Sequence, residues 1–558
     1  MGDRGERIGG RVQIQDTYDV VVLGSGLAGL TAALAAALEG ADVALLEKAE
    51  LIGGTTALSG AGIWIPANPI AAEKGIEDSL EEGAAYLESL SNGMILPELA
   101  EALISGGPGF VEFLHENTDL RLRLVEGYPD YHPEHPGGKA GGGRTLEPGL
   151  FSFAGMEQWI DRIGGDIQRI VLTEMPLGGG TGVVAPEVLA AREEAAEEGL
   201  GRALVGGVLK ACLAQGVRVE IRCRALRLRT DDRRVVGVEV ETDDGMRTVG
   251  ARAVVLATGG FEYDPDLVRD FLRGPLTRPI GAPTNTGDGL RMAMRVGARL
   301  GNMREAWWSP MVPCPGTRRD GVPAAMLSSR ERALPGSIMV NRYGRRFANE
   351  AANYNAFGGA FHHLDESKLD YPNLPAYMIF DQSTVDRFGV FGGHPGAPVP
   401  DWVESAPTLD ALAAALGLPV DAVLGSVARF NEYAERGVDP DFSRGSSAFD
   451  RFPGGRMSDP DSPHATLGPV RTAPFYAVEV VSSALGTKGG PRTDTAGRVV
   501  DVDGEVIAGL YAAGNVMANP SGMVYGGAGA TLAVAGIWGM RAGRAAVADC
   551  VQVSELHC

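Results

Sequence analysis

Apolar residues near the start of the chain form three consecutive blocks of different kinds. Residues 18–24, YDVVVLG, are a continuous β-branched run of the type found in a parallel strand buried on both faces. The alanine-rich block at 31–40, TAALAAALEG, predicts a helix that ends near Gly40, and DVALLEK at 42–48 predicts a second strand. The motif GSGLAG lies between the first strand and the helix. Residues 18–48 are therefore predicted to form a βαβ unit.

Further along, short blocks of alternating residues indicate more strands. Residues 217–260 predict a meander with turns at Asp231-Asp232 and Asp243–Gly245, and it returns to a buried strand in AVVLATGG. The charged segment 191–203, AREEAAEEGLGRA, predicts a solvent-exposed helix.

The pattern of apolar and polar residues changes between about residues 304 and 472. There, Trp307-Trp308, proline-rich turns and polar helical patterns replace the strand alternation. Strand-like sequence returns in FYAVEVV and GLYAAGNV. A chain of 558 residues is too long for one hydrophobic core. We therefore predict an α/β fold, with a Rossmann-type domain built from residues 17–304 and 473–549 and an inserted α+β substrate or catalytic domain at 305–472.

Composition narrows the function classes. The 71 acidic residues outnumber the 50 Lys and Arg residues, and the net charge of −21 argues against nucleic acid and anionic membranes as partners. Five cysteines without metal-type spacing fit a reducing compartment, and the first residues lack the apolar core of a signal peptide, so we expect a cytoplasmic protein. Residues 506–540 carry no charge, but their eight glycines favour a buried, ligand-lining segment over a membrane span.

The first candidate site is the glycine motif itself. Gly24, Gly26 and Gly29 lie between strand and helix, and Glu47 follows 18 residues after the last glycine, at the end of the second strand. This context is typical of adenine-dinucleotide binding, in which the acid contacts the ribose. The motif alone leaves NAD and FAD as alternatives.

Four later segments separate these alternatives. GGTTALSGAGIW at 53–64, ATGG at 257–260, NTGDG at 285–289 and GLYAAGN at 509–515 complete a set that resembles the fumarate reductase and 3-ketosteroid dehydrogenase superfamily of flavoproteins. The resemblance implies an FAD cofactor. It is non-covalent here, because the GGTTALSG loop lacks the histidine of covalent members. The implied cofactor residues are Gly24, Gly26, Ala28, Gly29, Glu47, Lys48, Gly54, Thr55, Thr56, Ser59, Gly60, Ala257, Gly259, Asp288, Gly514, Asn515, Thr531 and Leu532.

Within the superfamily, the chain is most similar to the 3-ketosteroid Δ1-dehydrogenases. Their Pro-Asp-Tyr segment gives Tyr131, their Arg-Phe-x-Asn-Glu-x-x-x-Tyr segment gives Tyr354, and their C-terminal motif gives Tyr525 and Gly529. Two supporting matches are ALGTKGGPRTD at 484–494 and GVDPDFSRG at 437–445. One departure is Gly526, where the family usually has proline, which predicts a more pliable loop.

The resemblance assigns roles for the desaturation of a ketone. The Tyr525 hydroxyl and the Gly529 N–H hold the ketone oxygen, and Tyr354, as a phenolate assisted by Tyr131, takes the proton from carbon 2. FAD accepts the hydride from carbon 1. The predicted function is therefore 1,2-desaturation of a 3-ketosteroid, an apolar small molecule.

Three alternatives stay open. Gly526 prompts a smaller cyclic ketone as substrate. A fumarate-type reductase is disfavoured because no cationic residue occurs between Val499 and Met540 to clamp a dicarboxylate. A non-catalytic flavin electron carrier would have no use for the phenols. No metal is expected at His132 and His135, and the sequence does not indicate the electron acceptor, the oligomeric state or the preferred ketone.

Overall fold

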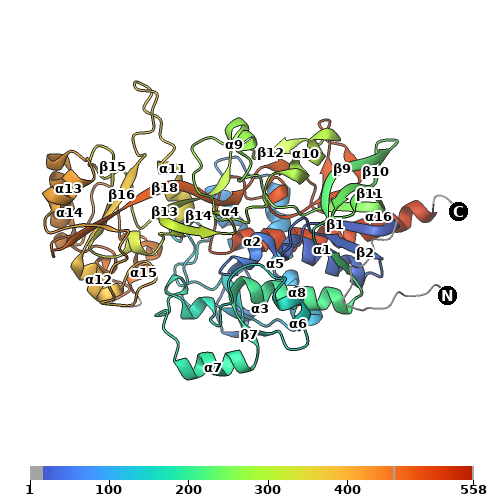
Figure 1. Cartoon of the computed structure of the whole chain (residues 1–558), viewed down its shortest axis with the longest axis horizontal. Coiled ribbons are helices and arrows are strands. Elements are labelled where there is room, and N and C mark those ends of the chain that lie inside the picture. Colours follow the sequence, from blue (N-terminus) through green and yellow to red (C-terminus); the bar gives the residue numbers. More distant parts are fainter. Residues whose placement is uncertain (1–16, 456–458, 556–558) are drawn as a thin grey trace.

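Two β-sheets organise the protein, and their strands gather at opposite ends of the molecule (Figure 1). The computed structural model describes residues 17–455 and 459–555. The first sheet holds, in order, β20, β21, β11, β1, β2 and β8, with β10 and β9 continuing from β11. Its strands are β1 (Thr17–Leu23), β2 (Val43–Leu46), β8 (Arg218–Glu220), β9 (Arg224–Asp231), β10 (Arg234–Thr242), β11 (Gly245–Leu256), β20 (Arg498–Val500) and β21 (Val506–Ala512).

Strand β1 lies at the centre of this sheet and pairs in parallel with β2 and β11. Its register places Val20 opposite both Val43 and Ala253. Val20, Val21 and Val22 are fully buried, as the continuous apolar run predicts. The structure confirms the βαβ unit, the meander and its turns, and the mixed α/β fold.

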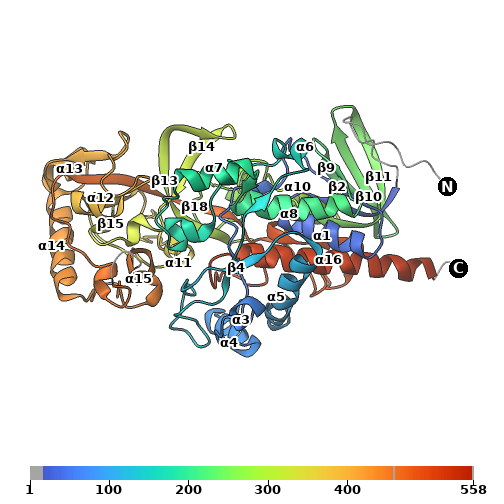
Figure 2. The same cartoon turned by 90° about the horizontal axis from the view of Figure 1, so that it is seen from below.

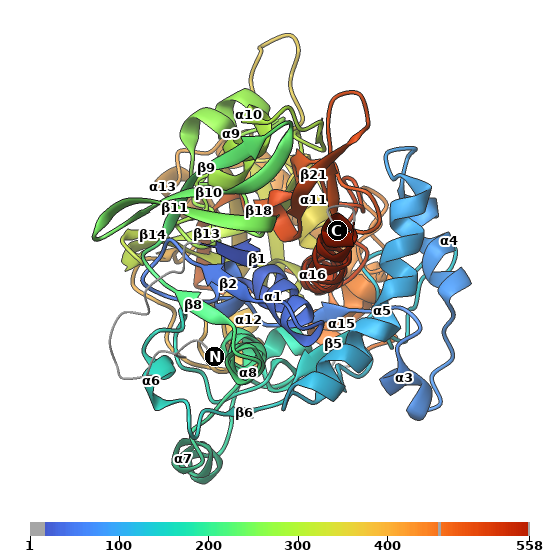
Figure 3. The same ribbon diagram turned by 90° about the vertical axis from the view of Figure 1, so that its right-hand side faces the viewer.

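Three helices pack side by side. They are α1 (Leu27–Leu38), α8 (Leu200–Ala214) and α16 (Ala530–Glu555), with α1 between the other two (Figures 2 and 3). Two of them, α1 and α16, contact the first sheet. Small residues allow close approach, since a Cβ added at Gly539 would lie 2.4 Å from the Ala28 carbonyl oxygen. The alanine-rich sequence of α1 is thus a packing surface. None of the described helices is both long and apolar enough to cross a membrane.

The predicted exposed helix at 191–203 is wrong. This segment contains the end of α7 (Pro186–Glu194), the short strand β7 (Glu197–Glu198) and the first turn of the buried helix α8. The chain turns at Ala196, which has a φ of +51°. The charged residues suggested solvent exposure, but Glu198 is buried, where it forms a 2.5 Å ion pair with Arg202.

The second sheet has the order β14, β13, β18, β16 and β15, with β17 also paired to β18. Its strands are β13 (Ala306–Arg319), β14 (Val322–Leu327), β15 (Ser337–Asn341), β16 (Ala376–Asp381), β17 (Glu404–Ala406) and β18 (Phe475–Thr487). Helices α11 (Tyr354–Ala360), α12 (Gln382–Phe388), α13 (Leu409–Ala415), α14 (Val420–Arg436) and α15 (Ala448–Gly455) belong to the same part of the chain. Strand β18 follows the predicted boundary at residue 472 yet belongs to this sheet, and the division into domains stays a prediction.

The remaining elements link these parts. Strands β3 (Ile63–Trp64), β4 (Leu122–Leu124) and β5 (Thr145–Pro148) form a small separate sheet. Helices α2 (Gly54–Ala57), α4 (Leu80–Leu90), α5 (Pro97–Asn117) and α10 (Asp288–Arg295) lie outside the sheets. The loop between β21 and α16 contains Tyr525.

Candidate active site

One cavity of about 850 Å³ runs from the turn after β1 to the loop that carries Tyr525. It is lined by the β1–α1 turn, by α2 and by the β13–β14 hairpin, among other segments. All four predicted catalytic residues lie in this lining, as do all the predicted cofactor residues except Gly29. A Cβ at Gly29 would lie 1.9 Å from the Gly24 carbonyl oxygen, so Gly29 permits the tight turn and lies outside the lining.

At one end of the cavity, a buried acid is fixed by its neighbours. The Glu47 carboxylate is 7% exposed and accepts hydrogen bonds from the Ser25 amide at 2.9 Å and the Ser25 hydroxyl at 2.6 Å. Lys48 lies beside it and pairs with Asp288 at 3.0 Å. This fixed carboxylate at the end of β2 suits a ribose.

The turn between β1 and α1 is suited to a pyrophosphate. The N-cap residue of helix α1, Gly26, has no side chain to cap the helix, and the Thr56 hydroxyl accepts from the Leu27 amide at 3.0 Å; helix N-termini attract anions. A Cβ at Gly26 would meet nothing closer than 3.6 Å, which leaves the backbone open to the cavity. The buried Thr258 hydroxyl in the lining has no partner in the described part of the chain. These residues fit an adenine dinucleotide.

At the other end of the cavity, three phenols from distant segments meet. The ring centroids of Tyr131, Tyr354 and Tyr525 are 5.2 to 5.4 Å apart in all three pairs. Tyr131 comes from the loop before β5, Tyr354 begins α11 and Tyr525 precedes α16. All three rings are buried.

Burial dominates the acidity of these phenols. It raises the pKa of Tyr354 and of Tyr131 well above the ordinary tyrosine value, and it also raises the pKa of Tyr525. A hydrogen-bonding contact from the Tyr131 hydroxyl acts in the opposite direction on Tyr354. The neighbouring Tyr525 hydroxyl raises the pKa of Tyr354 further, so the net shift is upward.

The Tyr525 hydroxyl faces three donors. The Thr531 hydroxyl donates to it at 3.0 Å, and the Tyr354 hydroxyl and the Gly529 amide also lie close enough to lower its pKa against the larger effect of burial. A Cβ at Gly529, where φ is +96°, would lie 2.2 Å from the Gly62 backbone, so only glycine fits. The Gly529 amide and the Tyr525 hydroxyl are therefore adjacent in the cavity lining.

Comparison with known proteins gives the family. The FAD binding domain family matches residues 19–532. The chain is 38% identical to the 3-oxosteroid 1-dehydrogenase of Mycobacterium tuberculosis, covering 94% of this chain and 97% of the relative. The chain belongs to the 3-ketosteroid Δ1-dehydrogenase family of FAD flavoproteins. It is an FAD-dependent oxidoreductase.

Two further relatives are named for substrates of different size. The crystal structure of the 3-ketosteroid Δ1-dehydrogenase of Sterolibacterium denitrificans, in complex with 1,4-androstadiene-3,17-dione, has a TM-score of 0.86 at 32% identity, covering 96% of this chain and all of the other. The 4-oxocyclohexanecarboxylate 2-dehydrogenase of Sinomonas cyclohexanicum is 42% identical, covering 95% of this chain and 93% of the relative. The family thus includes relatives named for steroid and for small-ring substrates.

A fourth phenol of this flavoprotein escaped the sequence reasoning. Tyr128 is buried in the cavity lining, and its hydroxyl makes a hydrogen-bonding contact with that of Tyr131. It lies three residues before Tyr131 in the segment that holds the Pro-Asp-Tyr motif. A second tyrosine in a segment already assigned to the site was the available signal.

Lys488, in the ALGTKGGPRTD match, supports the Tyr525 loop. Its buried ammonium group donates to the Val524 carbonyl at 2.5 Å and lies 3.9 Å from the centroid of the Trp307 ring. Trp307 in turn packs edge-on against Tyr525, at 4.6 Å between centroids. Burial lowers the pKa of Lys488 to about 7. A single lysine thus contacts both the backbone of the Tyr525 loop and the indole ring that packs on Tyr525.

A buried network of ion pairs joins two of the segments that resemble the family, residues 345–354 and residues 437–445. Arg346 pairs with Glu350 at 2.7 Å and with Asp439 at 2.9 Å, and Arg444 pairs with Glu350 at 3.2 Å. Asp439 and Arg444 belong to GVDPDFSRG, whereas Arg346 and Glu350 belong to RRFANEAANY. The network fixes the segment that leads into α11.

Asn353 joins the Tyr354 segment to Tyr131. Its side-chain oxygen caps α11 by accepting from the Ala356 amide at 3.0 Å, and its amide group donates to the Tyr131 carbonyl at 3.3 Å. The Gly526 carbonyl accepts from the Tyr131 amide at 2.9 Å and from the Tyr86 hydroxyl at 2.7 Å. Two hydrogen bonds therefore hold the carbonyl of Gly526, the residue that replaces the usual proline. The greater pliability of its loop stays a prediction.

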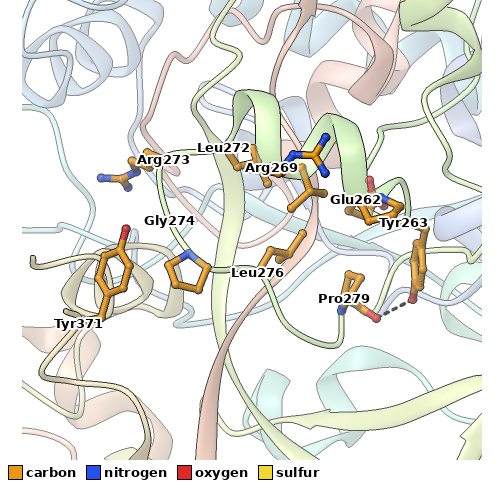
Figure 4. Close-up of a pocket in the computed structure, with 12 residues that line it drawn as sticks. Glu262, Tyr263, Arg269, Leu272, Arg273, Gly274, Leu276, Pro279 and Tyr371 are labelled. Atoms are coloured by element: carbon orange, nitrogen blue, oxygen red, sulfur yellow. Dashed lines mark hydrogen bonds between the residues drawn. The ribbon is translucent and has the colours of Figure 1, made fainter. Parts of the chain in front are cut away.

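Two other features do not change the choice of site. One ligand atom each from His132, Glu134 and His135 lie within 4.8 Å of one another, but the His132 ring already pairs with the Asn353 amide, and the absence of a metal stays a prediction. A second hollow of about 540 Å³ contains none of the four predicted catalytic residues (Figure 4). There the Tyr263 hydroxyl donates to the Pro279 carbonyl at 2.5 Å.

The lining predicts that FAD is held without a covalent bond. No histidine lies in the described lining, and burial raises the pKa of its one cysteine, Cys223, to about 12, so that a reactive thiolate is absent at neutral pH. Heating or acid should release free FAD into the supernatant, as measured by its absorbance. Flavin that stayed with the precipitated chain would contradict this expectation.

The ion network predicts a large effect of Glu350→Gln. The change leaves Arg346 and Arg444 without their shared carboxylate, and we expect a loss of about 3–5 kcal/mol in the free energy of unfolding, measured by denaturant titration. The matched control is Asp119→Asn, which breaks an exposed 2.7 Å pair with Lys210 and should cost about 1 kcal/mol or less. Equal effects of the two changes would show that the network is not stabilising.

The same network predicts how this contribution depends on pH. The neighbouring arginines overcome the effect of burial and lower the pKa of Glu350 from 4.5 to about 2. The stabilisation is therefore complete above the unfolded pKa and is lost as the pH falls toward 2.

Proposed function

We propose that this flavoprotein introduces the carbon 1 to carbon 2 double bond of a 3-ketosteroid. The observation that carries the proposal is the convergence of Tyr131, Tyr354, Tyr525 and the Gly529 amide at one end of the cofactor cavity. Relatives at 38% and 32% identity are named for this reaction. The apolar lining by Leu172, Leu177 and Met326 suits a large hydrophobic substrate.

Each group has a defined task in this reaction. The Tyr525 hydroxyl and the Gly529 N–H donate to the ketone oxygen, which stabilises the enolate that forms there by about 2.7–4 kcal/mol per donor. Tyr354, as the phenolate, takes the proton from carbon 2, and Tyr131 donates a hydrogen bond to the Tyr354 oxygen. The residues of the lining would hold FAD, which would supply the acceptor for the hydride from carbon 1.

The charges in the lining favour a neutral ketone over a dicarboxylate. Its cations in the described part of the chain are Lys48 and Arg319. Lys48 pairs with Asp288 at 3.0 Å near the ribose end, and Arg319 pairs with Asp166 at 3.5 Å. Neither belongs to the phenol cluster, so nothing there clamps two carboxylates.

A smaller cyclic ketone is the second candidate. It is favoured by the 42% identity to the 4-oxocyclohexanecarboxylate 2-dehydrogenase and by Gly526. In this alternative the chemistry at the phenols is unchanged. The carboxylate on the ring would be bound by Arg319, a cation of the described lining that lies on the β13–β14 hairpin.

Substrate comparison tests the proposal. Purified protein with a dye as electron acceptor should oxidise 4-androstenedione and a 5α-saturated 3-ketosteroid, and it should not act on fumarate, which has no ketone. Higher kcat/KM for 4-oxocyclohexanecarboxylate than for both steroids would select the second candidate. Reduction of fumarate as the main activity would overturn both.

The same assay predicts the effect of Tyr525→Phe. Removing one of the two donors to the ketone oxygen should lower kcat for the preferred ketone by roughly 10²–10³-fold. The control is Tyr433→Phe, since this hydroxyl lies 3.3 Å from Asp441 outside the cavity lining, and its kcat should not change. An unchanged kcat in the Tyr525 variant would remove this residue from the mechanism.

A further inference from the structure

The loop that carries Tyr525 needs contacts from outside it to hold a fixed position. Tyr525 is followed by Gly526 and Gly527, and glycine leaves the backbone more conformations than any other residue. The proposed reaction needs the Tyr525 hydroxyl at a defined place relative to Tyr131 and Tyr354, because a misplacement of about 1 Å can cost roughly 10²-fold in rate. Groups outside the loop must therefore fix its backbone.

Tyr86, on helix α4, makes such a contact. Its side chain is fully buried, and its hydroxyl donates to the Gly526 carbonyl at 2.7 Å and accepts from the His132 amide at 3.0 Å. Gly526 directly follows Tyr525 in the chain, and His132 directly follows Tyr131. One hydroxyl group therefore joins the backbone beside one of these tyrosines to the backbone beside the other.

A third hydrogen bond strengthens this link. The Tyr131 amide also donates to the Gly526 carbonyl, at 2.9 Å, so that carbonyl receives one bond from helix α4 and one from the Tyr131 loop. Loss of the Tyr86 hydroxyl would remove one of these two donors and also the acceptor that the His132 amide uses. Burial raises the pKa of Tyr86 well above the ordinary tyrosine value, so the hydroxyl keeps the proton that it donates.

The Tyr86 ring is itself fixed by two buried neighbours. The Arg144 guanidinium carbon lies 5.6 Å from the centroid of this ring, and the Trp64 ring centroid lies 6.1 Å from it. Arg144 pairs with Asp78 at 2.6 Å and with Asp130 at 2.8 Å, and Asp130 also accepts from the Trp64 indole N–H at 2.7 Å. Tyr86 thus belongs to a connected buried cluster that can serve as a fixed point for both loops.

We propose that the Tyr86 hydroxyl sets the position of Tyr525 relative to Tyr131 and is a positioning residue for the ketone reaction. This role rests on the proposed function. Tyr86 lies outside the described lining of the cavity, so it acts through the two loops rather than on the substrate. No motif in the sequence indicates the role, because the contact joins helix α4 to segments that are distant in the chain.

Tyr86→Phe tests this role, since it removes the hydroxyl and keeps the ring. In the FAD-loaded protein, kcat for the preferred ketone per bound flavin should fall by roughly tenfold. KM should change less than kcat, because Tyr86 does not line the cavity. Reoxidation of dithionite-reduced flavin by the dye should keep its rate, because that step needs no phenol. A purely structural role would lower stability and leave kcat per bound flavin unchanged.

A double variant tests whether Tyr86 acts through Tyr525. In the Tyr525→Phe protein the hydroxyl to be positioned is absent, so adding Tyr86→Phe should lower kcat by clearly less than tenfold. Fully additive losses would overturn the proposal. The matched control is Tyr476→Phe, which removes a hydroxyl that donates to the Gln382 side chain at 2.6 Å, outside the cavity lining, and its kcat should not change.

The remaining outcomes also decide the question. Should Tyr86→Phe give no flavin-containing protein, Gly526→Ala disturbs the same contact from the other side, because an added Cβ would lie 3.2 Å from the Tyr86 ring and 3.3 Å from the Trp64 ring. It should lower kcat in the same way, with the dye reaction unchanged. An unchanged kcat in the variant that folds would overturn this role alone, provided that the unchanged protein oxidises a ketone. An unchanged protein that oxidised no ketone would overturn the proposed function, and this role with it.

Discussion

Burial of the phenols is the constraint on which the rest of the site depends. In a dry environment a tyrosine keeps its proton, and Tyr131, Tyr354 and Tyr525 are all within a few per cent of complete burial. A closed site is nevertheless useful for an enolate, because donors such as Gly529 act most strongly where water is absent. The surrounding structure must therefore supply the polarity that water would otherwise give, at defined positions.

The fold meets this demand by bringing distant segments to one point. Strand β18 begins in the second sheet and ends at Thr487, whose hydroxyl accepts from the Phe261 amide in the loop after β11. The next residue, Lys488, braces the Tyr525 loop, and Asn353 ties the Tyr131 loop to α11. Both parts of the molecule thus contribute contacts to the phenol cluster.

The sequence predicted the elements whose signals are local. The βαβ unit, the meander and the positions of the cavity-lining residues follow from short motifs, but the six-stranded second sheet does not, because its pairings join residues as distant as Ala306 and Thr487. The exposed helix at 191–203 failed because the burial of Glu198 depends on Arg202 and on the packing of α8. Tyr128 was missed although it lies in the segment of Tyr131, because its contact with the Tyr131 hydroxyl is visible only in the fold.

Solvent exchange measures the central claim most directly, because it isolates the proton step from hydride transfer. A 3-ketosteroid is incubated without electron acceptor in D₂O with the FAD-loaded protein or its Tyr354→Phe variant, and deuterium at carbon 2 is measured by mass spectrometry. A phenolate base predicts incorporation by the unchanged protein and incorporation slower by roughly 10²-fold or more in the variant, with ketone binding retained. Equal rates in the two proteins would contradict the account.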